Sequence, residues 1–262
     1  MALSLKAVAP AQGARWLSQG FKAFARRPFA FCGMYVAFLL LALLAGSIPY
    51  LGGVLMLWAM PLLSLAFMIA TRSALQGGPV HASQFIEGLR ARAPNRIALA
   101  IVCAAYAAAM LGVFYLGDFA DGGAVTRAMQ LMGKGDATRK QLDAVLADPQ
   151  LAFGIGLRSV LIALVSVPFW HAPALVHWGG QGAAQALFSS ALAVWRSKGA
   201  FTVYSLAWAA LALAWAVLVL LLLTLLGSRQ LLGLVAMPTG LVFSTVFYVS
   251  LWFTFKDSFS VD

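Results

Sequence analysis

Two of the three histidines in the chain lie in one short apolar stretch, FWHAPALVHWGG, at residues 169–180. Histidine pairs can bind a metal ion or relay protons, and ionisable groups inside a membrane are candidate functional sites. His171 and His177 are six residues apart, which separates them by about 240° around a helix. A metal-binding pair on a helix uses the spacing i and i+4, which brings both rings to one face. The spacing therefore disfavours a metal site and leaves His171, the deeper residue, to be explained.

Other residue patterns that support catalysis are missing from the sequence. The glycine-rich pieces lack the Lys-Ser/Thr partner of a phosphate-binding loop. No Asp or Glu lies in the central part of an apolar segment, where ion-coupled transporters usually carry one. We therefore expect no cofactor, no metal and no enzyme activity. A membrane enzyme that uses His171 is the alternative, and it requires a polar pocket around that ring.

Arg158 is the only basic residue well inside an apolar segment. A long cationic side chain near the end of a span can reach back to the polar interface. We expect Arg158 either to do so or to pair with Asp118 or Asp121, and we favour both over a role in substrate binding.

The elements that carry these residues are membrane-spanning helices. The 262-residue chain is 62% hydrophobic and 10% charged, whereas about a quarter of a soluble domain is charged. The mean hydropathy is +0.89, and the apolar runs are long enough to cross about 30 Å of hydrocarbon. Continuous apolar runs exclude a β-barrel, whose strands alternate. We predict one all-α transmembrane domain over 1–262 with spans at 29–48, 50–70, 97–116, 151–178, 201–226 and 231–255.

The distribution of basic residues predicts the orientation in the membrane. The side that receives both termini holds 12 of the 18 Lys and Arg residues and three of the eight acids. The opposite side holds six basic residues and five acids, so it is close to neutral. Because cytoplasmic loops are enriched in Lys and Arg, we predict a multi-pass bacterial inner-membrane protein with cytoplasmic N- and C-termini. The net charge of +10 reflects this topology and does not indicate nucleic-acid binding.

Residues 11–27 form an amphipathic segment that is too polar to span. At about 100° per residue, Trp16 and Phe24 fall on one apolar arc and the basic residues fall opposite. Residues 183–198 show a similar pattern, and residues 83–94 show a weaker one. Such helices lie in the membrane interface with their cations toward anionic lipid, although a helix packed on the floor of the bundle has the same pattern. The predicted lipid-facing cations are Arg15, Lys22, Arg26, Arg27, Arg196 and Lys198.

The amphipathic segments mark a predicted internal repeat. A shift of 171 residues superposes 17–27 on 188–198, and each amphipathic segment precedes a pair of spans. We predict three pseudo-repeats, each an interfacial helix followed by a helical hairpin. The second span of each pair contains proline, and the fourth span is also too long for a straight helix, so a kink is expected there. Repeats can frame a pathway at their interface. The predicted kink or cavity residues are Pro61, His171, Pro173 and Pro238.

A polar segment at 117–150 joins the third and fourth spans and lies in the periplasm in this topology. Thr138 and Gln141 have the spacing of a capping box, which predicts a helix through Leu146. Residues 125–132 favour another short helix. The five aspartates lack the spacing of a calcium-binding loop, so we expect a small helical cap.

Two segments carry a resemblance to a known family. The run at 14–28, with Trp16 and a basic pair before Pro28, resembles the opening of a family of multi-pass inner-membrane proteins found mainly in β-proteobacteria. Residues 169–176 resemble the Trp-Phe-Ala-Pro-x-Leu-Val core of that family, with His171 where the family carries Phe. The resemblance covers most of the chain outside the external loop. It implies a proteobacterial inner-membrane protein, and since the family has no established activity, no residue role carries over.

The expected function is a non-enzymatic scaffold or a lipid-interacting role in the inner membrane. The expected partners are membrane lipids, anionic ones at the cytoplasmic face, and no protein partner follows from the sequence. One alternative is an uncoupled transporter, channel or flippase-like protein with a cavity between the repeats. Another is an accessory subunit of a larger membrane complex, which copurification from native membranes would reveal.

Overall fold

The computed structural model describes residues 3–49, 51–90, 92–133, 138–227 and 231–261. Within these ranges six helices are long and apolar enough to cross a membrane, which confirms the predicted all-α polytopic fold. Helices are required because a bilayer core offers no water to pair with the backbone. The predicted ends differ from the observed ones by five residues or fewer, and Tyr50, where the second predicted span begins, lies outside the described residues. The six spans are Pro28–Gly46, Leu51–Leu75, Ala93–Ala120, Pro149–Gly179, Lys198–Leu225 and Leu232–Ser258.

Short elements precede and connect the spanning helices. The predicted interfacial helix at 83–94 is reduced to α4 and a single 3₁₀ turn, because α5 begins at Ala93 with Pro94 in its first turn. In chain order the elements are β1 (Leu3–Leu5), α1 (Gln12–Arg26), α2 (Pro28–Gly46), α3 (Leu51–Leu75), α4 (Gln84–Glu87), η1 (Gly88–Arg90), α5 (Ala93–Ala120), α6 (Ala124–Gly133), α7 (Arg139–Leu146), α8 (Pro149–Phe169), α9 (Ala172–Gly179), α10 (Ala183–Arg196), α11 (Lys198–Leu225), α12 (Leu232–Ser258) and β2 (Phe259–Val261).

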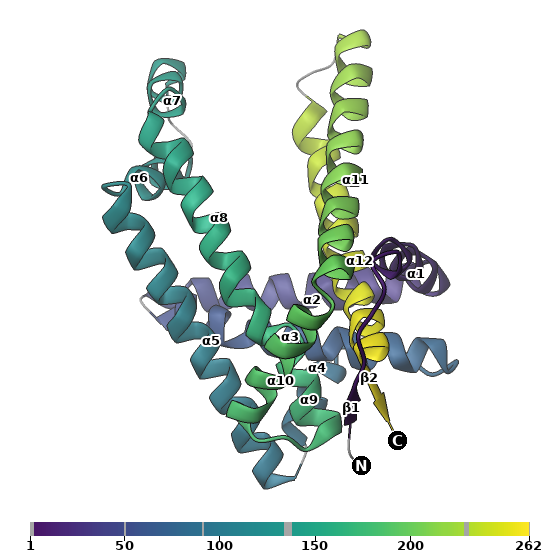
Figure 1. Cartoon of the computed structure of the whole chain (residues 1–262). Coiled ribbons are helices and arrows are strands. Elements are labelled where there is room, and N and C mark those ends of the chain that lie inside the picture. Colours follow the sequence, from purple (N-terminus) through teal and green to yellow (C-terminus); the bar gives the residue numbers. More distant parts are fainter. Residues whose placement is uncertain (1–2, 50, 91, 134–137, 228–230, 262) are drawn as a thin grey trace.

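Figure 1 shows helical hairpins that diverge from a common region. The α5/α8 and α11/α12 hairpins extend toward the same end of the view and splay apart, while α2 and α3 run across behind them. We call the common region the hub; it comprises α1, α9, α10, the C-terminal half of α12 and the two strands. α3 packs against both α5 and α12, and 50% of its apolar window is buried, against 11% for α11. α3 is therefore the central helix, and α11 presents most of its surface outward.

Each short helix packs on a hairpin other than the one that it precedes. α4 contacts α3, α10 contacts α8 and α9, and α1 contacts α11 and α12, so the hairpins are linked in a ring. The predicted shift of 171 residues between α1 and α10 is wrong by one residue. The buried positions of the two helices superpose at a shift of 170. Superposition by side-chain type gives 171, whereas close packing selects small residues at the buried positions. The corresponding buried positions are Trp16, Gly20 and Ala23 on α1, and Ala186, Ser190 and Ala193 on α10.

The two ends of the chain form an antiparallel pair of strands that the sequence did not predict. Leu5 pairs with Phe259, and the hydroxyl oxygens of Ser4 and Ser260 lie 2.6 Å apart. The backbone N–H of Lys6 donates to the carbonyl of Ser258, just before β2, at 2.9 Å. The pairing brings both ends of the chain together, which is compatible with an even number of spans, since these leave both ends on one side of the membrane. Residues 3–5 and 259–261 are therefore strand within an otherwise helical protein.

The segment between α5 and α8 is the helical cap that the sequence predicts. Thr138 and Gln141 form the expected capping box at the start of α7, and α6 covers the second predicted helix. Pro149 begins α8, and the Asp148 carboxylate accepts from the N–H of Gln150 at 2.9 Å.

Arg158 joins the cap to α8 through two ion pairs. Its guanidinium lies 2.6 Å from Asp118 and also pairs with Asp121, so pairing and not snorkelling is observed. Gly154 and Gly117 make room for these groups, because a Cβ on either residue would clash with them. Arg158 is buried, and a buried charge requires such partners.

We expect the cap to weaken in acid because of Asp121. The hydrogen bond from Arg158 lowers the pKa of this buried carboxyl below its usual range. A folded-state pKa below the unfolded value of about 3.9 adds stability above that pH, and the contribution disappears as the pH falls through the folded-state pKa. Asp121→Asn should cost about 1.5–3 kcal/mol near neutral pH and should flatten the loss of melting temperature below about pH 4.

The matched control is Asp118→Asn, since the Asp118 side chain is 44% exposed. Exposed ion pairs contribute about 1 kcal/mol or less, so this change should cost less than Asp121→Asn. Thermal unfolding of the purified protein across pH measures both variants. An equal loss of stability in the two variants would show that the burial of Asp121 does not strengthen its ion pair with Arg158.

Candidate functional site

The fourth span is broken, and not merely kinked as the sequence predicts. α8 ends at Phe169 and α9 begins at Ala172, with Trp170 and His171 between them. Pro173 explains the position of the break, because it has no N–H to donate to the carbonyl of Phe169 and its ring crowds that carbonyl. In the first turn of α9, by contrast, proline is tolerated. The span is therefore two helices in series.

Ser190 of α10 bonds to the backbone on both sides of the break. Its hydroxyl oxygen accepts from the N–H of His171 at 2.9 Å and donates to the carbonyl of Val167 at 3.1 Å. Ser190 is fully buried, and a buried polar group left unpaired costs about 1–3 kcal/mol. One side chain thus pairs two backbone groups and fixes α10 to the break.

His171 is enclosed in the hub. Its side chain is 0% exposed, and the rings of Phe201, Phe255 and Phe259 lie edge-on to it at centroid distances of 5.9, 5.9 and 5.5 Å. Its Nδ1 has no hydrogen-bond partner among the residues that the structure describes. No solute can reach this ring without opening the hub, so His171 fills space in an aromatic cluster. The phenylalanine that the family resemblance places here suits the same surroundings.

Thr254 of α12 ties both broken ends to the last span. Its hydroxyl oxygen accepts from the indole N–H of Trp170 at 3.2 Å and donates to the carbonyl of Leu251 at 2.8 Å. Nε2 of His171 lies 3.1 Å from the same oxygen. We assign Nε2 as the donor, because the single hydroxyl proton is already used.

Aromatic rings extend the hub from the break to α1. Trp170 packs edge-on against Phe201 and Tyr204 of α11. Trp16 of α1 also packs edge-on against Tyr204, and its indole N–H donates to the Asp257 carboxylate at 2.8 Å. Aromatic side chains therefore connect α1, the break, α11 and α12 in one cluster.

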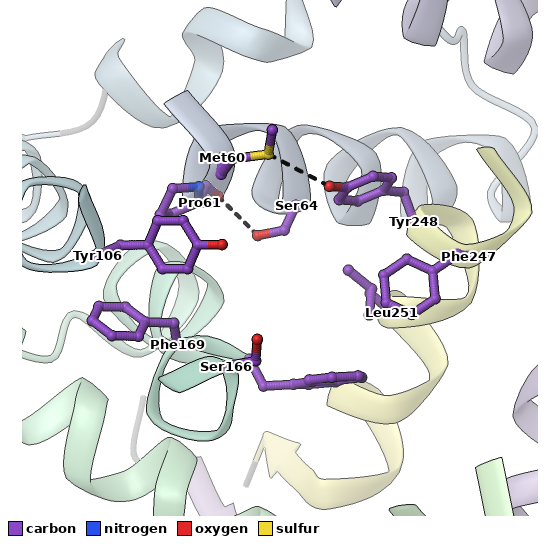
Figure 2. A pocket seen from close by; sticks show the side chains of 10 residues that line it. Met60, Pro61, Ser64, Tyr106, Ser166, Phe169, Phe247, Tyr248 and Leu251 are labelled. Atoms are coloured by element: carbon purple, nitrogen blue, oxygen red, sulfur yellow. Dashed lines mark hydrogen bonds between the residues drawn. The ribbon is translucent and has the colours of Figure 1, made fainter. Parts of the chain in front are cut away.

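A cavity of about 120 Å³ lies beside the break, between α3, α5, α8 and α12. Figure 2 shows the hydroxyl groups that these helices direct toward it, one from each helix. The hydroxyl residues are Ser64, Tyr106, Ser166 and Tyr248, and the other lining residues are Met60, Pro61, Phe169, Trp170, Phe247 and Leu251.

The hydroxyls of the cavity retain capacity to bind a small polar molecule. Ser64 donates to the carbonyl of Pro61 at 2.8 Å, and Ser166 donates to the carbonyl of Ile162 at 2.7 Å, which leaves both oxygens free to accept. Tyr106 has no hydrogen-bond partner within the described ranges and can donate. All ten lining side chains are uncharged. Since one water occupies about 30 Å³ of liquid, the cavity suits a few waters or one small neutral solute.

The predicted proline set does not share one cavity. Pro61 is buried and lines the central cavity, whereas Pro173 is buried at the start of α9. Pro238 is exposed inside α12, next to an apolar gap of about 440 Å³ between α11 and α12 that Trp215 and Phe243 line. The three prolines lie at three different places because each hairpin diverges from the others beyond the hub.

The predicted cations are all exposed, but α1 does not lie with its whole apolar face in lipid. Trp16 is 0% exposed, and α1 packs on α11 and α12. The apolar face of α1 around Trp16 therefore packs against the helix bundle, which is the alternative to burial in lipid. The guanidinium of Arg27 donates to the carbonyl of Gly77 at 3.2 Å, and the ammonium of Lys198 lies 5.2 Å from the Trp195 ring centroid. The exposed cations are Arg15, Lys22, Arg26, Arg27, Arg196 and Lys198.

Sequence reasoning missed the residues that repair the break and polarise the cavity. The sequence patterns single out none of Ser190, Thr254 and Tyr106. Isolated hydroxyl residues are common in apolar helices, so the sequence carried no signal that separates these three from the rest. The one usable signal was Pro173, which predicts unpaired backbone groups that some buried donor and acceptor must satisfy.

Replacing Ser190 tests the repair of the break. Ser190→Ala leaves the N–H of His171 and the carbonyl of Val167 unpaired, so we expect a loss of about 1–3 kcal/mol or more in unfolding free energy. Ser189→Ala is the control, since this neighbouring hydroxyl is not part of the break, and it should change stability by about 0.5 kcal/mol or less. Denaturant or thermal unfolding of the detergent-solubilised protein measures both. A neutral Ser190→Ala would mean that water or another group repairs the break.

The comparisons with known proteins agree with a protein of the inner membrane. The chain is 32% identical over 260 residues to a protein of Burkholderia thailandensis named "Probable inner membrane protein", and the match covers 99% of this chain and 95% of the relative. No family model matches the chain, and no solved structure matches it. With this identity over nearly the full length, the chain belongs to the same family of inner-membrane proteins as its β-proteobacterial relative.

Proposed function

We propose that this inner-membrane protein has no enzyme activity and binds anionic lipid through the cations of α1 and α10. This set comprises Arg15, Lys22 and Arg26 on α1 with Arg27 directly after it, and Arg196 on α10 with Lys198 at the start of α11. The observation that carries the proposal is the set of exposed, unneutralised cations on these helices. In the described part of the chain the two ion pairs are those of Arg158, so the cations of α1 and α10 have no carboxylate within 4.0 Å. Each exposed Lys or Arg near an anionic surface contributes on the order of 1 kcal/mol to attraction.

The packing of α1 supports the proposal by fixing its polar face outward. Trp16 and Gly20 hold the opposite face against α11 and α12. The cations of α1 are therefore carried on a helix that cannot turn over. A lipid headgroup that binds them meets a preorganised surface, which lowers the entropic cost of binding.

Exposed aromatic side chains beside the cations suit the membrane interface. Phe29 is 91% exposed just after the basic pair, and Phe188 and Trp195 are 69% and 71% exposed on α10. Aromatic rings combined with Lys and Arg are typical of helices at the headgroup level. The proposal places this surface, together with both termini, in the cytoplasm, because the excess of basic residues favours that orientation.

The test uses the full-length protein in nanodiscs that contain either zwitterionic lipid alone or added phosphatidylglycerol. We expect phosphatidylglycerol to raise the melting temperature and the effect to fall with salt. A variant with Gln at Arg15, Lys22, Arg26, Arg27, Arg196 and Lys198 should lose most of this increase. A control variant with Gln at the cap residues Arg127, Arg139 and Lys140 should keep it. An equal response of both variants, or no response of the wild type, would overturn the proposal.

A second candidate function is uncoupled passage of a small neutral polar solute. The observation that favours it is the central cavity beside a broken helix, since discontinuous helices often frame transport sites. We expect Ser166→Leu to fill the cavity and to abolish uptake of glycerol or urea by proteoliposomes. Ser159→Leu on the exposed side of α8 is the control and should leave uptake unchanged. Wild-type uptake no faster than that of empty liposomes would refute this function, whatever the lipid result.

A further inference from the structure

A polar pocket of about 400 Å³ lies at the ends of α3 and α9, separate from the central cavity. Its walls come from the last turns of these helices, from the segment at 79–83 and from α4. Ser73 and Gln84 hold that segment in place, because both side chains donate to the carbonyl of Pro79, at 2.7 and 3.3 Å. These two hydrogen bonds therefore fix the segment that forms one wall of the pocket.

Arg72 supplies a positive charge that no carboxylate neutralises. Its guanidinium carbon lies 5.7 Å from the ring centroid of Trp178 and 5.8 Å from that of Trp252. Contact with two ring faces orients the guanidinium and leaves its N–H groups free for a planar or tetrahedral oxyanion. Throughout the described ranges no acid lies within ion-pair distance of Arg72.

His177 adds a second polar group without a partner. Its Nδ1 is buried and has no hydrogen-bond partner among the described residues, and the residue lines the same pocket as His81. An imidazole nitrogen can donate to a phosphate oxygen or accept from a cationic N–H. His177 therefore can complete the coordination of a ligand that Arg72 holds.

Glu87 supplies a negative charge to the same pocket. It is exposed on α4 and lines the pocket without forming an ion pair with Arg72. The pocket thus holds one positive and one negative pole that are kept apart, with space between them. Such an arrangement disfavours a simple anion and complements a molecule that carries both charges.

We infer that this pocket binds the phosphoethanolamine headgroup of a membrane phospholipid. The phosphate lies against Arg72 and His177, and the ammonium group donates to Glu87. Arg72 lies at the depth of a headgroup, since it is in the last turn of a span, and Trp178 is near the end of another. Glu87 lines the same pocket. Tryptophan is enriched at this level of membrane proteins. The inference does not rest on the basic helices α1 and α10, whose cations lie outside the pocket.

Native mass spectrometry of the full-length protein, released from nanodiscs of mixed lipids, tests the inference. We expect phosphatidylethanolamine to be retained at least tenfold over phosphatidylglycerol and phosphatidylcholine, because the latter two lack an ammonium N–H for Glu87. Arg72→Gln should lower retention of phosphatidylethanolamine at least tenfold, and Arg72→Lys should restore part of it. Arg90→Gln, a change at an exposed arginine of η1 outside the pocket, is the control and should change nothing.

Glu87→Gln separates a zwitterionic site from a purely anionic one. We expect this variant to lose the preference for phosphatidylethanolamine and to retain phosphatidylglycerol equally well. Equal retention of both lipids by the wild type, or an unchanged preference in Glu87→Gln, would overturn the inference. Displacement of the bound lipid by free phosphoethanolamine at equal concentration would also overturn it, because the pocket would then bind a soluble solute.

The variants used for α1 and α10 distinguish this site from the proposed function. Removal of those cations leaves Arg72 and Glu87 in place, so retention of phosphatidylethanolamine should persist. Conversely, Arg72→Gln should leave the stabilisation by phosphatidylglycerol intact.

Discussion

Inside a bilayer, a helix that stops and restarts leaves backbone N–H and C=O groups that water cannot pair. The break between α8 and α9 creates this problem, and side chains from two other elements solve it. Ser190 of α10 bonds to the backbone on both sides of the break, and Thr254 of α12 binds Trp170 and lies beside His171. Because the partners come from elsewhere in the chain, the break and the hub can form only together.

The hub explains the divergent shape of the molecule. Small residues let its elements approach closely: a Cβ on Gly20 would lie 2.7 Å from the Cβ of Ser250, so α1 lies directly on α12. Such close backbone contacts are how helices associate in lipid, where the hydrophobic effect gives no drive. Away from the hub, bulky aliphatic residues replace small ones, as in the leucine-rich outer half of α11. The hairpins therefore meet at the hub and diverge from it (Figure 1), and the central cavity lies between α3, α5, α8 and α12.

Burial decides how the arginines of the protein are used. Arg158 is 7% exposed and has two aspartates, because an unpaired buried charge would be too costly. Arg72 is exposed and packs on two tryptophans instead, so its charge remains available to a ligand. The cations of α1 and α10 are exposed as well. The buried arginine beside the cap is thus neutralised within the protein, whereas Arg72 and the cations of α1 and α10 keep their charge at the surface.

The sequence by itself determined the membrane class, the six spans, the capping box of α7 and the family, because hydropathy, cap spacing and short motifs are local properties. It also indicated a disturbance of the fourth span, since Pro173 removes a backbone donor wherever it stands. Only the tertiary structure decided that this disturbance is a full break, that Ser190 and Thr254 repair it, and that His171 is enclosed. It also decided that α1 packs on the last hairpin, that the terminal strands pair, and that Pro238 lies far from the central cavity. The physical reason is that each of these features depends on a partner distant in the chain, and a hydroxyl or a tryptophan carries no local sign of which partner it will meet.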